Sequence, residues 1–211
     1  MIEELLQPKN LWFLAQGLGV TLIISVGSLF LSFMFGTTLG VFRHSGSKPW
    51  AKAAGLYVEV VRNIPNLLFI LGVRFLTPLP PLVAAIVAFT IFTTAAVAEI
   101  VRGGLNSIPK GQWEAARSQG FSSLGILVHV VLPQALRNMV PPLMSQAITV
   151  IKDTSFVWVV GIEELTGKGM ILMGTYATLP QVFTLFGLLA ATYFAVNFGL
   201  ARWSRAVKAR T

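Results

Sequence analysis

The sequence predicts an all-α integral membrane protein with about five transmembrane helices and a two-helix loop on one side of the membrane. Of its 211 residues, 55% are hydrophobic and 11% are charged, whereas soluble domains carry about 25% charged residues. A soluble fold of this size would leave much apolar surface exposed and would aggregate. Three runs without charged residues, 10–42, 75–98 and 169–201, each exceed the roughly 20 residues that a helix needs to cross the bilayer.

Two further spans are apolar but interrupted by charge. One contains Glu59, Arg62 and Arg74, and the other contains Arg137. The first apolar run follows Glu3 and an adjacent glutamate instead of a basic segment, so we expect a retained anchor and not a signal peptide. The predicted spans cover about 12–41, 53–76, 82–102, 134–152 and 180–201.

The basic residues predict the orientation of these spans. They collect in segments 42–52, 102–133 and 202–211, where Glu114 is the one acid. Because basic residues are enriched in cytoplasmic loops, we expect a cytoplasmic C-terminus and an N-terminus outside. The same rule accounts for the net charge of +8, so we expect a lipid bilayer and not nucleic acid as the partner of the basic residues.

The polar loop 103–133 has the pattern of two short helices. Asn106 and Ser107 can cap the first helix, and Pro109 suits its first turn. Gly120 stands where a helix ends with positive φ, and the serines that follow it can cap a second helix. The sequence therefore predicts a compact two-helix knob on the cytoplasmic side.

The spacing within this loop resembles the EAA loop of ABC-importer permeases, E-A-A-x3-G-x9-I-x-L-P. Valine replaces the isoleucine of that pattern. An ordinary amphipathic helix on the lipid surface is the alternative, but 106–120 offers little apolar face. The resemblance implies that the loop couples the chain to an ATP-hydrolysing subunit through Glu114, Ala115, Ala116, Gly120, Val130, Leu132 and Pro133.

Three strings resemble the polar amino-acid branch of this family: YVEVVRNIP (57–65), AEIVRGGLNSIPKGQWEAARSQG (98–120) and IKDTSFVWVVGIEEL (151–165). The resemblance implies the ABC type I importer permease fold, with 1–211 forming one transmembrane domain. It also implies a second permease, identical or paralogous, two ATPases and an extracytoplasmic amino-acid-binding protein. ATP and Mg²⁺ would be bound by the ATPases, so we expect no cofactor in this chain.

Four ionisable residues near the cytoplasmic ends of the second and third spans are expected to form ion pairs that link these two spans. Glu59 and Arg62 are three residues apart, as are Glu99 and Arg102, so each pair shares a helical face. A charge at bilayer depth costs at least about 2.5 kcal/mol, which favours pairing.

Other polar residues are candidates for the substrate path. The guanidinium of Arg74 could clamp an α-carboxylate or reach the membrane interface, and it stands where the family usually has an aromatic residue. Lys152 and Asp153 could meet the carboxylate and the ammonium of an amino acid, or form a local salt bridge. The candidates are Asn66, Arg74, Lys152, Asp153 and Thr154.

The expected function is ATP-driven import of a polar amino acid, with glutamate, aspartate or glutamine favoured by Arg74 and Lys152. Basic amino acids or cystine are alternatives within the family. No set of acid, base and nucleophile indicates an enzyme, and His44 and His129 lack metal-ligand spacing. A self-sufficient secondary transporter or channel subunit is the alternative from another class, although the chain lacks the internal repeat usual in such transporters.

Overall fold

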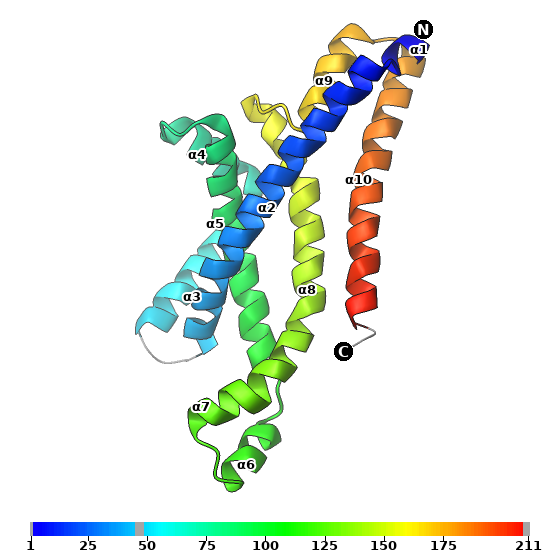
Figure 1. Cartoon of the computed structure of the whole chain (residues 1–211). Coiled ribbons are helices and arrows are strands. Elements are labelled where there is room, and N and C mark those ends of the chain that lie inside the picture. The colour runs from blue at the N-terminus through cyan, green and yellow to red at the C-terminus, as the bar shows by residue number, and fades with distance from the viewer. Residues whose placement is uncertain (1, 45–48, 209–211) are drawn as a thin grey trace.

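The computed structural model describes residues 2–44 and 49–208, which contain helices and turns but no strand. Segments 45–48 and 209–211, parts of two predicted basic segments, lie outside the described residues. Figure 1 shows long helices side by side, with α6 and α7 at the end opposite the N-terminus. The elements are α1 (Ile2–Leu5), α2 (Pro8–His44), α3 (Pro49–Arg62), α4 (Asn66–Leu76), α5 (Pro81–Asn106), α6 (Lys110–Ser118), α7 (Ser123–Ile126), η1 (Leu127–Val131), α8 (Leu132–Asp153), η2 (Thr154–Val160), α9 (Leu165–Thr175) and α10 (Leu179–Lys208).

The prediction of about five spans is confirmed. Among the described residues, four helical stretches are long and apolar enough to cross a membrane, and the bent pair α3–α4 adds a fifth. The four stretches are Pro8–His44, Pro81–Asn106, Ser123–Val160 and Leu179–Ala206.

The second predicted span, 53–76, is not one straight helix. Its two halves, α3 and α4, meet at an angle of 99°. Pro65 lies at the break and has no N–H to continue the helix, and its ring disfavours helical φ and ψ at Ile64. The backbone N–H groups of Asn63 and Ile64 therefore bond only three residues back, at 3.3 and 3.4 Å.

Helix α2 buries small and polar residues and exposes large apolar ones such as Phe30 and Phe33. Small side chains let two membrane helices approach closely. A Cβ added at Gly36 would lie 2.7 Å from Val97, which shows how near α5 comes. The buried stripe consists of Gly17, Thr21, Ser25, Ser28, Ser32, Gly36 and Gly40.

The fourth span is longer than the predicted 134–152. Helix α7 continues through the π-helical turn η1 directly into α8. The predicted second loop helix is therefore the N-terminal part of this span and not a separate element. Beyond Asp153 the chain forms the 3₁₀-helix η2, turns at Gly161 with φ of +80°, and enters α9. Helix α9 was not among the predicted elements.

Candidate coupling and transport sites

The loop around α6 begins one turn later than the sequence predicted. Asn106 is still part of α5, and Ser107 closes that helix by donating its Oγ hydrogen to the Gly104 carbonyl at 2.7 Å. The prediction that Asn106 and Ser107 cap α6 is therefore wrong, and Pro109 occupies the N-cap position. Leu105 of α5 is buried in one apolar cluster with Ile108 and Ala116 of the loop. This burial favours continuation of the helix to Asn106.

The end of α6 follows the prediction at Gly120. This residue has φ of +83°, and its N–H donates to the Arg117 carbonyl at 3.0 Å while the Phe121 N–H donates to Ala116 at 3.2 Å. These two bonds form a Schellman motif, which satisfies carbonyls that a helix end leaves free. Ser122 then caps α7, accepting the Gly125 N–H at 3.1 Å. The loop is thereby fixed in one conformation.

The predicted coupling residues divide between two sides of the loop. Glu114 and Ala115 are exposed on α6, whereas Ala116 is buried in an apolar cluster beneath it. Val130 packs against that cluster, and Leu132 and Pro133 are exposed at the start of α8. Glu114, Ala115, Leu132 and Pro133 are thus accessible to a partner, while Ala116 and Val130 support the loop from inside.

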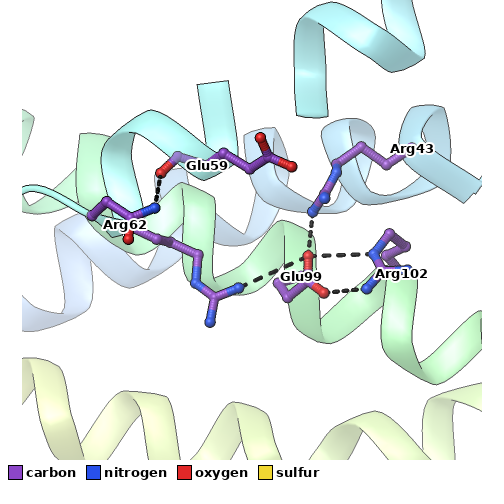
Figure 2. A network of polar contacts seen from close by, with 6 residues as sticks. Arg43, Glu59, Arg62, Glu99 and Arg102 are labelled. Carbon is purple, nitrogen blue, oxygen red and sulfur yellow. Dashed lines mark hydrogen bonds and ion pairs between the residues drawn. The ribbon is translucent and has the colours of Figure 1, made fainter. Parts of the chain in front are cut away.

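Figure 2 shows one carboxylate, Glu99, among three arginines from three helices. Arg43 of α2 and Arg102 of α5 both donate hydrogen bonds to Glu99, and Nη1 of Arg62 lies 4.0 Å from its Oε2. Glu99 and Arg102 are thus brought together as the sequence indicated. Arg43 was not expected, because a contact between positions 56 residues apart leaves no signal in local spacing.

The pairing of Glu59 with Arg62 is not formed. Among the described residues, the Glu59 side chain has no ion-pair or hydrogen-bond partner, and its backbone carbonyl accepts from Asn63 at 2.7 Å. Arg62 instead turns toward Glu99, and this ion pair links the second and third spans (Figure 2). Spacing by three residues brings two side chains near one another, but it does not fix the direction in which each side chain points.

Residues of the predicted substrate path meet at the bend of the second span. Asn66, the first residue of α4, donates its Nδ2 hydrogen to Oδ2 of Asp153 at 3.2 Å. Lys152 is exposed beside it. Thr154 is fully buried, and its hydroxyl donates to the Ile151 carbonyl at 2.7 Å, so it does not face a path.

Arg74 lies in the last turn of α4. Its Nε is buried, and within the described part of the chain it has no hydrogen-bond partner. Asn66, at the other end of α4, donates a hydrogen bond to Asp153 of α8. Arg74 is thus not part of the contact between α4 and α8.

A buried carboxylate that the sequence reading missed joins three helices. Glu164 is fully buried at the N-terminus of α9. It accepts hydrogen bonds from the N–H groups of Thr166 and Gly167 at 3.0 and 2.8 Å, and from the hydroxyls of Tyr193 and Thr21 at 2.8 and 3.2 Å. Burial raises the pKa of Glu164, and the donated bonds oppose that shift.

Metal chemistry has no visible site in the part of the chain that is described. No group of three His, Cys, Asp or Glu side chains is placed to hold an ion, and the sequence contains no cysteine. The polar residues described above can bind charged or hydrogen-bonding ligands, transmit force or hold helices together.

The sequence is similar to known transport proteins over nearly its whole length. A family model described as "Binding-protein-dependent transport system inner membrane component" matches residues 32–211. The probable glutamine ABC transporter permease protein GlnP of Bacillus subtilis (strain 168) is 42% identical over 96% of this chain and 95% of its own length. The glutamate/aspartate import permease protein GltK of Escherichia coli O6:H1 is 32% identical over 96% and 95%.

Solved structures agree with these similarities. A chain in the crystal structure of an amino acid ABC transporter with histidines has a TM-score of 0.88, 27% identity and 96% coverage of both chains. A chain of the MetNI methionine ABC transporter, in an inward-facing conformation, has a TM-score of 0.77 at 25% identity, over 96% of this chain and 99% of that one. Fold, family model and sequence identity agree: this chain belongs to the binding-protein-dependent transport system inner membrane components, the permease subunits of ABC transporters.

Proposed function

We propose that this chain is the permease subunit of an importer for a polar amino acid, with glutamine, glutamate and aspartate as the favoured substrates. The observation that carries the proposal is the 42% identity with the probable glutamine permease of Bacillus subtilis over 96% of the chain. Cystine is a second candidate, because the L-cystine permease TcyB of the same organism is 30% identical over 97% of the chain.

Transport would be driven by ATP hydrolysis in partner subunits, which also bind ATP and Mg²⁺. The α6 loop would transmit the motion, docking on an ATPase through Glu114 and Ala115. Two features support this role: α6 stands at one end of the molecule (Figure 1), and the Schellman motif at Gly120 closes its C-terminal end with two hydrogen bonds. A stiff, exposed helix can pass a displacement on to α5 and α8, between which it is connected.

The substrate path would follow an exposed polar stripe on α8. Asn138, Ser145, Thr149 and Lys152 are all exposed, and spacings of seven, four and three residues place them on one helical face. Polar groups at membrane depth need water or a protein partner instead of lipid. The stripe leads to the contact between Asn66 and Asp153, where an amino acid would find an amide, a carboxylate and the Lys152 ammonium.

The complete transporter would contain two permease copies, identical or paralogous, two ATPases and an extracytoplasmic binding protein. The N-terminus would lie outside and the C-terminus in the cytoplasm. Support for this orientation comes from α6 lying opposite the N-terminus (Figure 1) and from the basic residues at that end of the spans, including Arg43 and Arg102.

The proposal is tested by purifying the chain in mild detergent with its ATPase and measuring uptake after reconstitution with the binding protein. We expect ATP-dependent uptake of labelled glutamine or glutamate. We also expect Glu114→Lys and Gly120→Leu to lose the ATPase. Gly111→Ala lies on α6, where nothing lies within 4 Å of an added Cβ; it is the matched control and should retain the ATPase.

Two results would contradict the proposal at different points. Equal retention of the ATPase by Glu114→Lys, Gly120→Leu and the control would show that the loop is not the coupling element. Uptake of cystine without uptake of glutamine, glutamate or aspartate would move the substrate to the second candidate.

A further inference from the structure

A polar cavity of about 410 Å³ lies between α2, α3 and α5. Its size is within the range of about 300–1,000 Å³ typical of small-molecule sites. Polar groups in a membrane-spanning region face water, protein or a ligand, and this cavity is too polar for lipid chains. It is lined by Arg43, Val58, Glu59, Arg62, Asn63 and Glu99.

Two charged side chains that line this cavity form no close ion pair among the described residues. The Glu59 carboxylate is unpaired among the described residues, and Figure 2 shows it turned toward the side of Arg43. The Arg62 side chain is 53% exposed and reaches Glu99 only at 4.0 Å. Both residues belong to α3, three residues apart, and both line the cavity. An acceptor for a cation and a donor for an anion therefore face the same space.

These two groups are complementary to a zwitterion. The α-ammonium and α-carboxylate of an amino acid are attached to one carbon, so a single ligand in the cavity presents both charges to its lining. A guanidinium binds a carboxylate through two parallel hydrogen bonds. Asn63 donates its Nδ2 hydrogen to the Glu59 carbonyl, which leaves its Oδ1 as a second acceptor for the ammonium.

We propose that this cavity binds the α-amino-acid moiety of the transported molecule, with Glu59 and Asn63 receiving the ammonium and Arg62 the carboxylate. The site recognises the part that all amino acids share, so discrimination between side chains would occur elsewhere. This inference rests on the proposed function, because an amino acid must first enter the membrane domain.

The position of the cavity makes it a second station after the Asn66–Asp153 contact. Arg62 and Asn66 flank the bend between α3 and α4. Helix α3 lies on the α6 side of this bend and α4 on the N-terminal side (Figure 1). In the proposed orientation, a molecule that leaves Asp153 toward the cytoplasm would next meet Arg62 and Glu59.

The test uses the permease–ATPase complex in nanodiscs of phosphatidylcholine and phosphatidylglycerol, neither of which carries a primary ammonium. L-Glutamine is the probe, and N-acetyl-L-glutamine and L-glutaminamide are analogues that lack the ammonium charge and the carboxylate. Binding is measured for the intact chain and for Glu59→Gln and Arg62→Gln. Glu3→Gln, an exposed position on α1, is the control substitution.

We expect L-glutamine to bind about tenfold more weakly to Glu59→Gln and to Arg62→Gln than to the intact chain, with retained ATPase showing that the variants are folded. The analogues distinguish a contact from a general disturbance. N-Acetyl-L-glutamine should bind the intact chain and Glu59→Gln equally, and L-glutaminamide should bind the intact chain and Arg62→Gln equally. Uniform weakening of all three ligands would overturn the proposal, because it indicates a structural effect.

Two other outcomes also decide the matter. If the reconstituted complex takes up L-glutamine while both variants bind it as the intact chain does, the proposed function stands and this site is wrong. If that result is accompanied by loss of bound phosphatidylethanolamine from the variants in nanodiscs containing that lipid, the cavity belongs to a headgroup instead. Absence of uptake of any polar amino acid would instead refute the proposed function itself.

Discussion

Glu164 shows how one side chain can hold together the junction of α2, α9 and α10. Four donors from α2, α9 and α10 converge on its carboxylate. An amide NH₂ group in place of one carboxylate oxygen would meet these donors and would find no acceptor unless they rearranged. The nearby Glu163, by contrast, is 59% exposed and lies 3.7 Å from Lys168. Two consecutive glutamates therefore differ in burial and in the number of hydrogen bonds that they accept.

We expect Glu164→Gln to destabilise the chain, because the amide nitrogen would face donors and leave buried groups unsatisfied. Each unsatisfied buried group costs about 1–3 kcal/mol. Thermal unfolding in detergent measures the effect, and Glu163→Gln is the control, with an expected change within about 0.5 kcal/mol. Equal midpoints for both variants would show that the four bonds do not stabilise the fold.

A second prediction separates the partners within the Glu99 cluster. Glu99→Gln leaves three arginines of three helices without their shared carboxylate, and an uncompensated charge inside a protein is strongly destabilising. Arg62→Gln removes only a half-exposed side chain at 4.0 Å. Glu99→Gln should therefore lower the yield of folded protein in the membrane much more than Arg62→Gln, as measured by fluorescence-detected size exclusion.

How much of this cluster the sequence reveals depends on distance along the chain. The contact of Glu99 with Arg102 follows from their spacing on one helix, and so does the nearness of Glu59 to Arg62. Spacing does not decide which pair forms, because Arg62 can approach the carboxylate of either Glu59 or Glu99. Arg43 comes from another helix, and its partner is fixed only when α2 packs on α5.

Helix α2 packs in the manner of many membrane helices, with its smallest residues inside and its aromatic residues outside. In lipid, exposed apolar side chains cost nothing, so close contact between backbones becomes the main source of specificity. From Gly17 to Gly40, glycine, threonine and serine residues recur along α2 every three or four residues, and that repetition could have predicted the face that meets α5.

We expect Gly36→Leu to weaken the packing of α2 on α5. Any Cβ at this position would lie 2.7 Å from Val97 and 2.9 Å from the Thr94 carbonyl. Overpacking of this kind costs about 1–3 kcal/mol, which thermal unfolding would detect. Gly19→Leu is the matched control on the same helix, since nothing lies within 4 Å of its added Cβ. A loss of stability in the control as large as in Gly36→Leu would point to helix propensity instead of packing.

The end of α6 gives another contrast between two glycines. Gly120 has φ of +83°, a conformation that costs residues with a side chain about 1–2 kcal/mol. Gly111 lies within α6, where alanine is a better helix former than glycine. Gly120→Ala should therefore speed hydrogen exchange of the α6 amides, and Gly111→Ala should leave it unchanged or slow it. Exchange rates that are unaffected by Gly120→Ala would mean that the motif does not hold the loop.

Helices that the sequence did not reveal share a physical cause. The number and approximate limits of the spans follow from hydropathy, and Gly120 correctly marked the end of α6. The bend before Asn66, the fusion of α7 with α8 and the helix α9 were missed. Hydropathy reports whether a segment suits lipid, but a broken helix and a straight one have the same composition. The Pro65 in the second span was the one local signal of the bend.

The proposed orientation of the whole chain in the membrane rests on the distribution of its charged residues. Arg43 and Arg102 lie near the C-terminal ends of α2 and α5 and form a cluster with Glu99 and Arg62 (Figure 2). Elsewhere the chain has the buried Glu164 and Lys168, whose Nζ lies 3.8 Å from the centroid of the Phe13 ring. Basic residues near the ends of the helices that lead toward α6 are what the positive-inside rule predicts for a cytoplasmic side.

The proposed orientation is open to a direct test, because the chain has no cysteine and single cysteines can be introduced without background. Glu3→Cys on α1 and Gly111→Cys on α6 are exposed positions near opposite ends of the molecule (Figure 1). In intact spheroplasts expressing the chain without its ATPase, a membrane-impermeant maleimide should label Glu3→Cys at once. It should label Gly111→Cys only after the membrane is permeabilised. The reverse pattern would place α6 outside, where no ATP-hydrolysing partner could reach Glu114, and would refute the orientation and the coupling role of the loop together.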